Sequence, residues 1–291
     1  MGIDMAEMTS TLHIIPAARR KALVIPREHG AWGMLLVPLL SGAAVGFLHG
    51  SNGTGLALLL TTALALFWLR TPAESLLGGG VMRAQSVAER WLAAKYALFL
   101  AAISAASLTG LLWGGKNLML LVIGGAAVVA FGLQWLARSI SHKYRMASQM
   151  IGAAGLSASA AAAYYVVMGR FDATAGALWL ASWIFAGDQI HYVQLTLHHS
   201  KVKGAAERFY RGMGFFFGQV VMFAAVFGAC SVGVLPKFVL FAFAPVFVRG
   251  LIFFFKKPAP LAFVRLGISE LMHSVSFGLL LFVSFAWKGW A

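Results

Sequence analysis

The stretch Asn117–Arg138 reads NLMLLVIGGAAVVAFGLQWLAR and carries no charged residue before Arg138. An α-helix needs about 20 mostly apolar residues to cross the hydrocarbon core of a bilayer. Because that core holds no water, a crossing segment must satisfy its own backbone groups, as a helix does. The stretch therefore predicts a transmembrane helix.

Similar apolar runs recur along the whole chain. Hydrophobic residues make up 60% of the 291 residues and charged residues only 11%, whereas about a quarter of the residues in a typical soluble domain are charged. This composition predicts an all-α fold, a polytopic membrane bundle of about nine transmembrane helices. The nine predicted helices span residues 30–49, 54–73, 91–113, 117–138, 147–168, 172–197, 209–234, 237–255 and 267–288.

Nine such helices leave room only for short loops and an N-terminal tail. We therefore predict a disordered cytoplasmic tail at residues 1–24 and a single transmembrane domain at 25–291. The segment Met1–Arg20 lacks the apolar core and the cleavage site of a signal peptide. Cys230 is the single cysteine, which excludes a disulfide framework and a thiol metal site.

The positions of the basic residues indicate how the chain is oriented in the membrane rather than that it binds a nucleic acid. Although the net charge is +14, the basic residues lie between apolar runs, so we expect no nucleic acid to bind. With the N-terminus in the cytoplasm, 18 of the 23 Lys and Arg fall on the cytoplasmic side, as the positive-inside rule requires. The C-terminus is then predicted outside. Four fall outside, and Arg249 lies within a predicted helix.

The acidic residues are few, and most of them share one side of the predicted bundle. Six of the nine fall at or near cytoplasmic helix ends, namely Glu28, Glu74, Glu89, Asp188, Glu207 and Glu270. The positive-inside rule sorts Lys and Arg but not Asp, Glu and His. Ionisable groups at membrane depth usually face a bundle interior or an aqueous cavity. We therefore predict a polar cavity that faces the cytoplasm.

Four polar clusters contribute to this side. They are Arg27-Glu28-His29, Arg70 with Glu74, Asp188 with His191, and Glu270 with His273. Spacings of three or four residues place each of the last three pairs on one helical face. Each cluster also has a purely structural interpretation, as an anchor at the lipid–water boundary, a local salt bridge or a helix cap.

The first of these clusters belongs to a recognisable motif. The stretch Pro26–Pro38, PREHGAWGMLLVP, resembles the opening signature of the YwiC-like family of bacterial integral membrane proteins. The resemblance extends to Ala163-Tyr164-Tyr165 and to Gly267–His273, GISELMH. It implies a multi-pass protein of the bacterial inner membrane.

The layout is also similar to that of the UbiA-type prenyltransferases. Arg27, Pro38 and Gly42 match the residue types that open those enzymes. Glu74 and Asp188 stand where those enzymes carry acid-rich motifs that hold Mg²⁺ for a prenyl diphosphate. Each position offers one acid here, where that family has several.

This resemblance implies a transferase that acts on a lipid or prenyl diphosphate, with Mg²⁺ as cofactor. The catalytic residues would be Asp188, His191 and Glu74, with Glu74 and Asp188 as the metal ligands. The substrate-binding residues would be Arg27, His29, Arg70, Lys201, Glu270 and His273.

Two other functions fit the same residues. The two acid-x-x-His pairs could hold iron or haem, in the manner of carboxylate bundles. The chain could instead be a transporter or a non-enzymatic membrane partner, with the lipid bilayer as its surroundings. A contact between Arg249 and Asp188 would favour substrate passage, because paired charges within membrane helices mark substrate paths.

Overall fold

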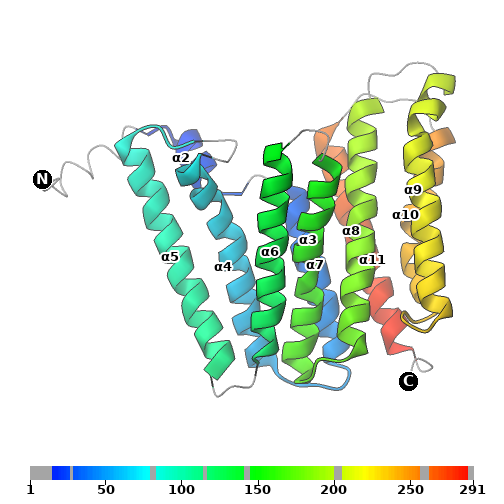
Figure 1. Ribbon diagram of the computed structural model, residues 1–291, viewed down its shortest axis with the longest axis horizontal. Coiled ribbons are helices and arrows are strands. Elements are labelled where there is room, and N and C mark those ends of the chain that lie inside the picture. The colour runs from blue at the N-terminus through cyan, green and yellow to red at the C-terminus, as the bar shows by residue number, and fades with distance from the viewer. Residues whose placement is uncertain are drawn as a thin grey trace, which may run out of the picture. The chain divides into compact units, whose positions relative to one another are not determined.

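The computed structural model describes residues 15–26, 29–78, 83–113, 117–140, 145–199, 205–255 and 262–287. Ten helices and no strand occur within these residues (Figure 1). The prediction of an all-α fold is therefore confirmed.

Each of the nine predicted stretches forms a helix. These helices are α3 (His29–Gly46), α4 (Gly53–Leu77), α5 (Val87–Leu112), α6 (Met119–Ile140), α7 (Arg145–Met168), α8 (Ala173–His199), α9 (Ala205–Ser231), α10 (Val239–Phe255) and α11 (Phe263–Ala286). Among the described residues, α4, α5, α6, α7, α9 and α11 are long and apolar enough to cross a membrane. Trp32–Gly46 and Val239–Phe255 are shorter apolar helices. The chain is thus a multi-pass membrane helix bundle.

Helix α4 is longer than the apolar run that predicted it. It continues past residue 73 to Leu77 and ends at Gly78, whose φ of +75° is a left-handed conformation that favours glycine. Arg70 and Glu74 therefore lie inside the helix rather than at its end.

The chain divides into two compact units. The single transmembrane domain at residues 25–291 stays a prediction. The first unit comprises Met1–His29 and Gly53–Asn117, and the second comprises Gly30–Asn52 and Leu118–Ala291. Helix α3 thus belongs to the second unit, although α2 (Ala17–Val24) and α4 on either side of it in the sequence belong to the first. The two units are described separately below.

The first unit contains α2, α4 and α5. Residues 17–24, which the sequence places in the tail, form α2 and bury Leu23 and Val24 against Ala84. The indole Nε1 of Trp68 donates a hydrogen bond of 2.8 Å to the carbonyl of Val24. The indole bond therefore joins α2 to α4, while the apolar contact joins α2 to the segment that precedes α5.

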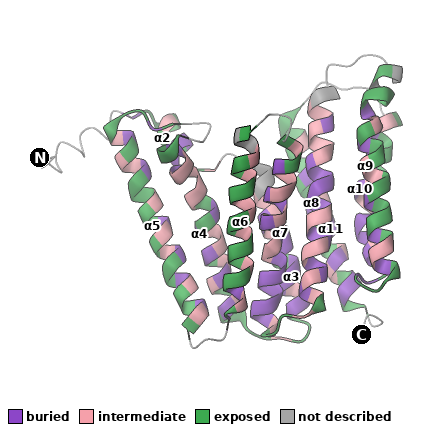
Figure 2. Ribbon diagram, viewed as in Figure 1, coloured by how far each residue is buried: buried purple, intermediate pink, exposed green. Residues whose placement is uncertain are grey.

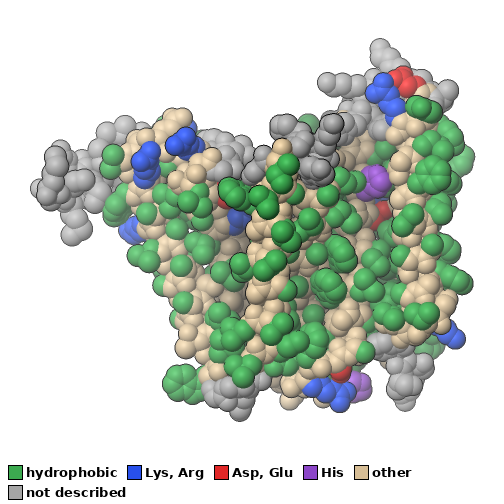
Figure 3. Space-filling view, viewed as in Figure 1, with side chains coloured by type: hydrophobic (Ala, Val, Ile, Leu, Met, Phe, Trp, Pro, Cys, Tyr) green, Lys and Arg blue, Asp and Glu red, His purple; other side chains and the backbone are tan. Residues whose placement is uncertain are grey.

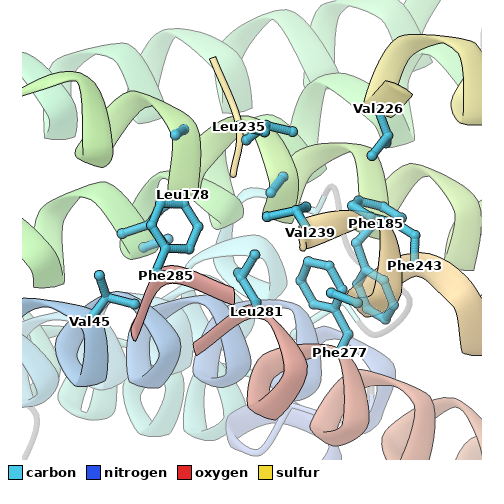
Figure 4. Close-up of a cluster of buried hydrophobic side chains, with 14 of the residues drawn as sticks. Val45, Leu178, Phe185, Val226, Leu235, Val239, Phe243, Phe277, Leu281 and Phe285 are labelled. Carbon is cyan, nitrogen blue, oxygen red and sulfur yellow. The ribbon is translucent and has the colours of Figure 1, made fainter. Parts of the chain in front are cut away.

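The second unit contains α3 and α6–α11 around an aromatic core. The rings of Phe185 and Phe277 stack with centroids 4.0 Å apart, and Phe243 meets Phe277 edge-on at 5.2 Å. Figure 4 shows these rings near Leu281 and Val239, with Phe285 and Leu178 further along the same core. Figure 2 shows buried residues along α7 and α8, which carry much of this core. Helix α8, which carries Asp188, therefore packs into this apolar core.

Helix α3 packs against α7 through small residues. A Cβ added at Gly42 would overlap the carbonyl oxygen of Ala160 on α7. The Ser159 hydroxyl donates a hydrogen bond of 3.1 Å to the carbonyl of Leu35. Because helices in lipid associate through close packing, small residues at such a crossing stabilise the second unit.

Candidate functional site

A buried arginine in the second unit binds two buried carboxylates. Arg249 on α10 donates from Nη2 to Asp188 Oδ2 at 2.7 Å, and from Nη1 to Glu270 Oε1 and Oε2 at 2.7 and 2.6 Å. Their side chains are 6%, 1% and 10% exposed, respectively. We call Arg249, Asp188 and Glu270 the charge cluster.

Polar and aromatic side chains surround the charge cluster. Gln219 on α9 donates from Nε2 to Asp188 Oδ1. The guanidinium of Arg249 lies over the ring of Tyr192, 4.0 Å from its centroid, in a cation–π contact. The site is therefore assembled from four helices, α8 to α11.

The local sequence explains how these groups meet. Asp188 and Tyr192 are four residues apart on α8, so both face Arg249. Gln189, the next residue of α8, donates to the Ser274 hydroxyl at 2.9 Å and to the carbonyl of Glu270 at 3.0 Å. These bonds tie α8 to α11 beside the cluster and fix the position of Glu270.

Two histidines lie beside the cluster. The His191 ring meets Phe215 edge-on with centroids 5.1 Å apart, and a Cβ added at Gly218 would lie 2.9 Å from two of its ring atoms. His273 Nδ1 lies 2.7 Å from the carbonyl of Ser269, one turn earlier on α11. Figure 3 shows histidine and acidic atoms at the surface between α8 and α9. Both histidines are half-buried, whereas the three side chains of the charge cluster are buried.

The described residues of the first unit contain two further ion pairs. Arg70 Nε binds Glu74 Oε1 at 2.7 Å, with side chains that are 27% and 41% exposed. This bond confirms that the two side chains share one helical face, and such exposed pairs contribute little to stability. The other pair joins Arg19 on α2 to Glu89 on α5, and its hydrogen bond raises the pKa of the Arg19 guanidinium.

Glu89 also caps the start of helix α5 (Val87–Leu112). The Ser86 hydroxyl accepts from the Glu89 backbone N–H at 3.2 Å, and a Glu89 carboxylate oxygen accepts from the backbone of Gln85 and Ser86. This capping box leaves the carboxylate only 7% exposed. Glu89 therefore has a structural role that accounts for its position.

The structure brings four of the predicted site residues into one neighbourhood. Asp188, His191, Glu270 and His273 lie on α8 and α11 of the second unit. Arg70 and Glu74 belong to the first unit. Arg27, Lys201 and the side chain of His29 lie outside the described residues.

The sequence did not predict the role of Gln219 or of Tyr192. Gln219 is a polar residue within the apolar run Phe215–Val221, FFFGQVV. A polar residue inside a predicted membrane helix is the same signal that singled out Arg249. Nothing in the local sequence indicates that Tyr192 lies against an arginine from another helix. Such a contact depends on how α8 and α10 pack.

Metal binding has little support among the described residues. They contain no group of three or more His, Cys, Asp or Glu placed to hold a metal ion. Both oxygens of Asp188 already accept hydrogen bonds, from Gln219 and Arg249. The metal roles of Glu74 and Asp188 stay predictions.

The fold and the cluster define a class, that of multi-pass helical membrane proteins with a buried arginine–carboxylate network. Residues 25–164 match the model of the family described as YwiC-like protein. The match confirms, for this part of the chain, the family predicted from Pro26–Pro38. It ends within α7, before the residues of the charge cluster. No curated protein and no solved structure matches the chain.

Proposed function

We propose that the chain is a transport protein that moves a small solute through the membrane together with protons. One observation carries this proposal, namely that a buried arginine holds two buried carboxylates. Ionisable side chains within membrane helices commonly belong to substrate paths or proton relays. We propose that the charge cluster binds the transported proton.

The charges of the cluster support this assignment. When Asp188, Glu270 and Arg249 are all ionised, their charges sum to −1. A net charge is unfavourable in a buried setting that offers little hydration. One proton on either carboxylate neutralises the cluster, and its release restores the negative charge. The cluster therefore has two states that differ by one proton.

The same residues give less support to prenyl transfer through Mg²⁺. A metal ion at Asp188 would have to replace the bond from Gln219 or from Arg249. It would also lie close to the positive guanidinium, which repels it. Proton binding requires neither change.

We further propose that the protein lies in the bacterial inner membrane with its N-terminus in the cytoplasm. The distribution of Lys and Arg supports this orientation, because 18 of 23 then fall on the cytoplasmic side. The cytoplasm-facing polar cavity predicted from the acids is part of the same proposal. The half-buried histidines beside the buried carboxylates support it, because their polar rings are partly open to the surroundings.

Proteoliposomes that enclose a pH-sensitive dye test the transport function. An inward proton gradient is imposed, the membrane voltage is clamped with potassium and valinomycin, and small organic anions, cations and neutral solutes are added class by class. We expect one class to accelerate internal acidification. We expect Asp188→Asn and Glu270→Gln to abolish this acceleration, because each removes a proton-binding carboxylate.

Glu207→Gln is the matched control. Glu207 is also an acid paired with an arginine, Arg211, but both side chains are more than half exposed. This variant should transport like the wild type. Solute-driven acidification that survives both Asp188→Asn and Glu270→Gln would refute the proposal, as would Mg²⁺-dependent prenyl transfer that requires Asp188.

A further inference from the structure

Two buried polar atoms beside the cluster have no hydrogen-bond partner among the described residues. They are Arg249 Nε, which is a donor, and Gln219 Oε1, which is an acceptor. The Arg249 side chain is only 6% exposed. Buried polar groups in native proteins are nearly always satisfied, so each unsatisfied one requires an explanation.

The two atoms belong to one neighbourhood. Arg249 and Gln219 bind the two oxygens of the same Asp188 carboxylate. Gln219 Oε1 lies against the backbone of Gly250, where an added Cβ would come within 3.1 Å of it. A single small ligand could therefore meet both side chains.

We propose that this neighbourhood binds an oxyanion that also carries an O–H group. The oxyanion accepts a hydrogen bond from Arg249 Nε, and its O–H donates to Gln219 Oε1. Hydroxycarboxylates and protonated phosphate groups share this chemistry. The inference rests on the proposed transport function, since it names the class of solute.

Protonation opens the guanidinium to this ligand. In the described state, Arg249 uses Nη1 for Glu270 and Nη2 for Asp188. When both carboxylates are protonated, they no longer compete as anions, and the oxyanion replaces Glu270 on the guanidinium. The two protons, the arginine and one oxyanion then form a neutral assembly. Oxyanion binding therefore strengthens as the pH falls.

Other titratable groups face these carboxylates from the surrounding helices. They are His273 on α11, Tyr192 on α8, which lies against Arg249, and His191, one turn after Asp188 on α8. Substitution of the two carboxylates is therefore needed to show that they cause the pH dependence of oxyanion binding. Asp188→Asn combined with Glu270→Gln mimics the protonated cluster, so this double variant should bind the oxyanion equally well at acidic and alkaline pH.

Equilibrium dialysis of the purified full-length protein with radiolabelled lactate, propionate and inorganic phosphate tests the ligand class. Lactate and propionate differ only in the hydroxyl that Gln219 would accept. We expect the wild type to prefer lactate by about tenfold, which corresponds to one hydrogen bond. Inorganic phosphate is the second ligand tested. Whichever of lactate and phosphate binds more tightly shows whether the oxyanion is a carboxylate or a phosphate.

Gln219→Leu should bind lactate and propionate equally, because it removes the acceptor. The comparison of lactate with propionate on the wild type needs no variant, so it decides the inference even where Gln219→Leu does not fold. Failure of lactate and phosphate to bind at any pH would overturn the inference and would indicate that bridging water satisfies both atoms. Proton-coupled transport of another solute would then still stand. Conversely, oxyanion binding without proton movement would refute the transport function alone.

Discussion

Arg249 binds two acids with one guanidinium and is held by side chains from two other helices, α8 and α11. At the scale of single residues, such a cluster is costly to break, because removal of one partner leaves a buried charge without compensation. Replacement of the whole cluster by neutral groups of similar size removes that penalty. The cluster is therefore better explained by function than by stability.

We expect Arg249→Met to destabilise the protein by about 3–5 kcal/mol, since Asp188 and Glu270 then lie buried without a cation. The triple variant Arg249→Met, Asp188→Asn and Glu270→Gln should recover most of that loss. Thermal unfolding in detergent measures both. A triple variant no more stable than Arg249→Met would show that the arginine acts through packing rather than charge.

Gly218 lets the His191 ring approach α9. We expect Gly218→Ala to displace this ring, because the added Cβ would lie 2.9 Å from its Cε1 and Nδ1 atoms. The histidine resonances should shift in an NMR spectrum of the labelled protein. The control is Gly214→Ala on the same helix, where an added Cβ meets nothing within 4 Å. Equal shifts in both variants would contradict the close approach.

At the scale of helices, α2 depends on a partner 70 residues away. Arg19 binds Glu89, which also caps α5, while the neighbouring Arg20 and Lys21 are exposed. We expect Glu89→Gln to accelerate tryptic cleavage within α2 about tenfold, because loss of a charged hydrogen bond allows the helix to open. The timed appearance of the fragments measures it. Glu74→Gln is the control, since it breaks a more exposed pair elsewhere in the same unit.

Helix α3 depends on a glycine. We expect Gly42→Ala to lower the stability of the second unit by about 1–3 kcal/mol, because the methyl group overlaps the Ala160 carbonyl and forces α3 away from α7. Gly176→Ala is a matched control in α8, where an added Cβ meets nothing within 4 Å. It should leave the melting temperature unchanged or raise it slightly. A stable Gly42→Ala protein would contradict the close crossing.

The same elements indicate what the sequence can predict. The apolar runs predicted the positions of α3 to α11, six of which are long and apolar enough to cross a bilayer among the described residues, because that crossing sets the length and composition of such a helix. Helix α2 was not predicted, since eight mixed residues form a helix only against partners from α4 and α5. The sequence singled out Asp188, Glu270 and Arg249, but not how they pair. That pairing depends on the packing of α8, α10 and α11, which local sequence does not determine.

At the scale of the whole molecule, the orientation is the main prediction left to test. Single cysteines at Ala17 and Trp287, both exposed, would report the two sides in a background with Cys230→Ser. We expect a membrane-impermeant maleimide added to intact cells to label position 287 and not position 17. The reverse pattern, or labelling of both positions, would contradict a cytoplasmic N-terminus with an odd number of crossings.

The net charge of the cluster also determines which step of the transport cycle a membrane voltage drives. With one proton, or with two protons and an oxyanion, the site is neutral and moves through the field without electrical work. The empty site carries one negative charge, and moving it across the whole field involves about 2.3 kcal/mol per 100 mV. The resting potential of a cell would therefore drive the return of the empty transporter. The movement of the loaded transporter would be driven by the concentration gradients of the proton and the solute.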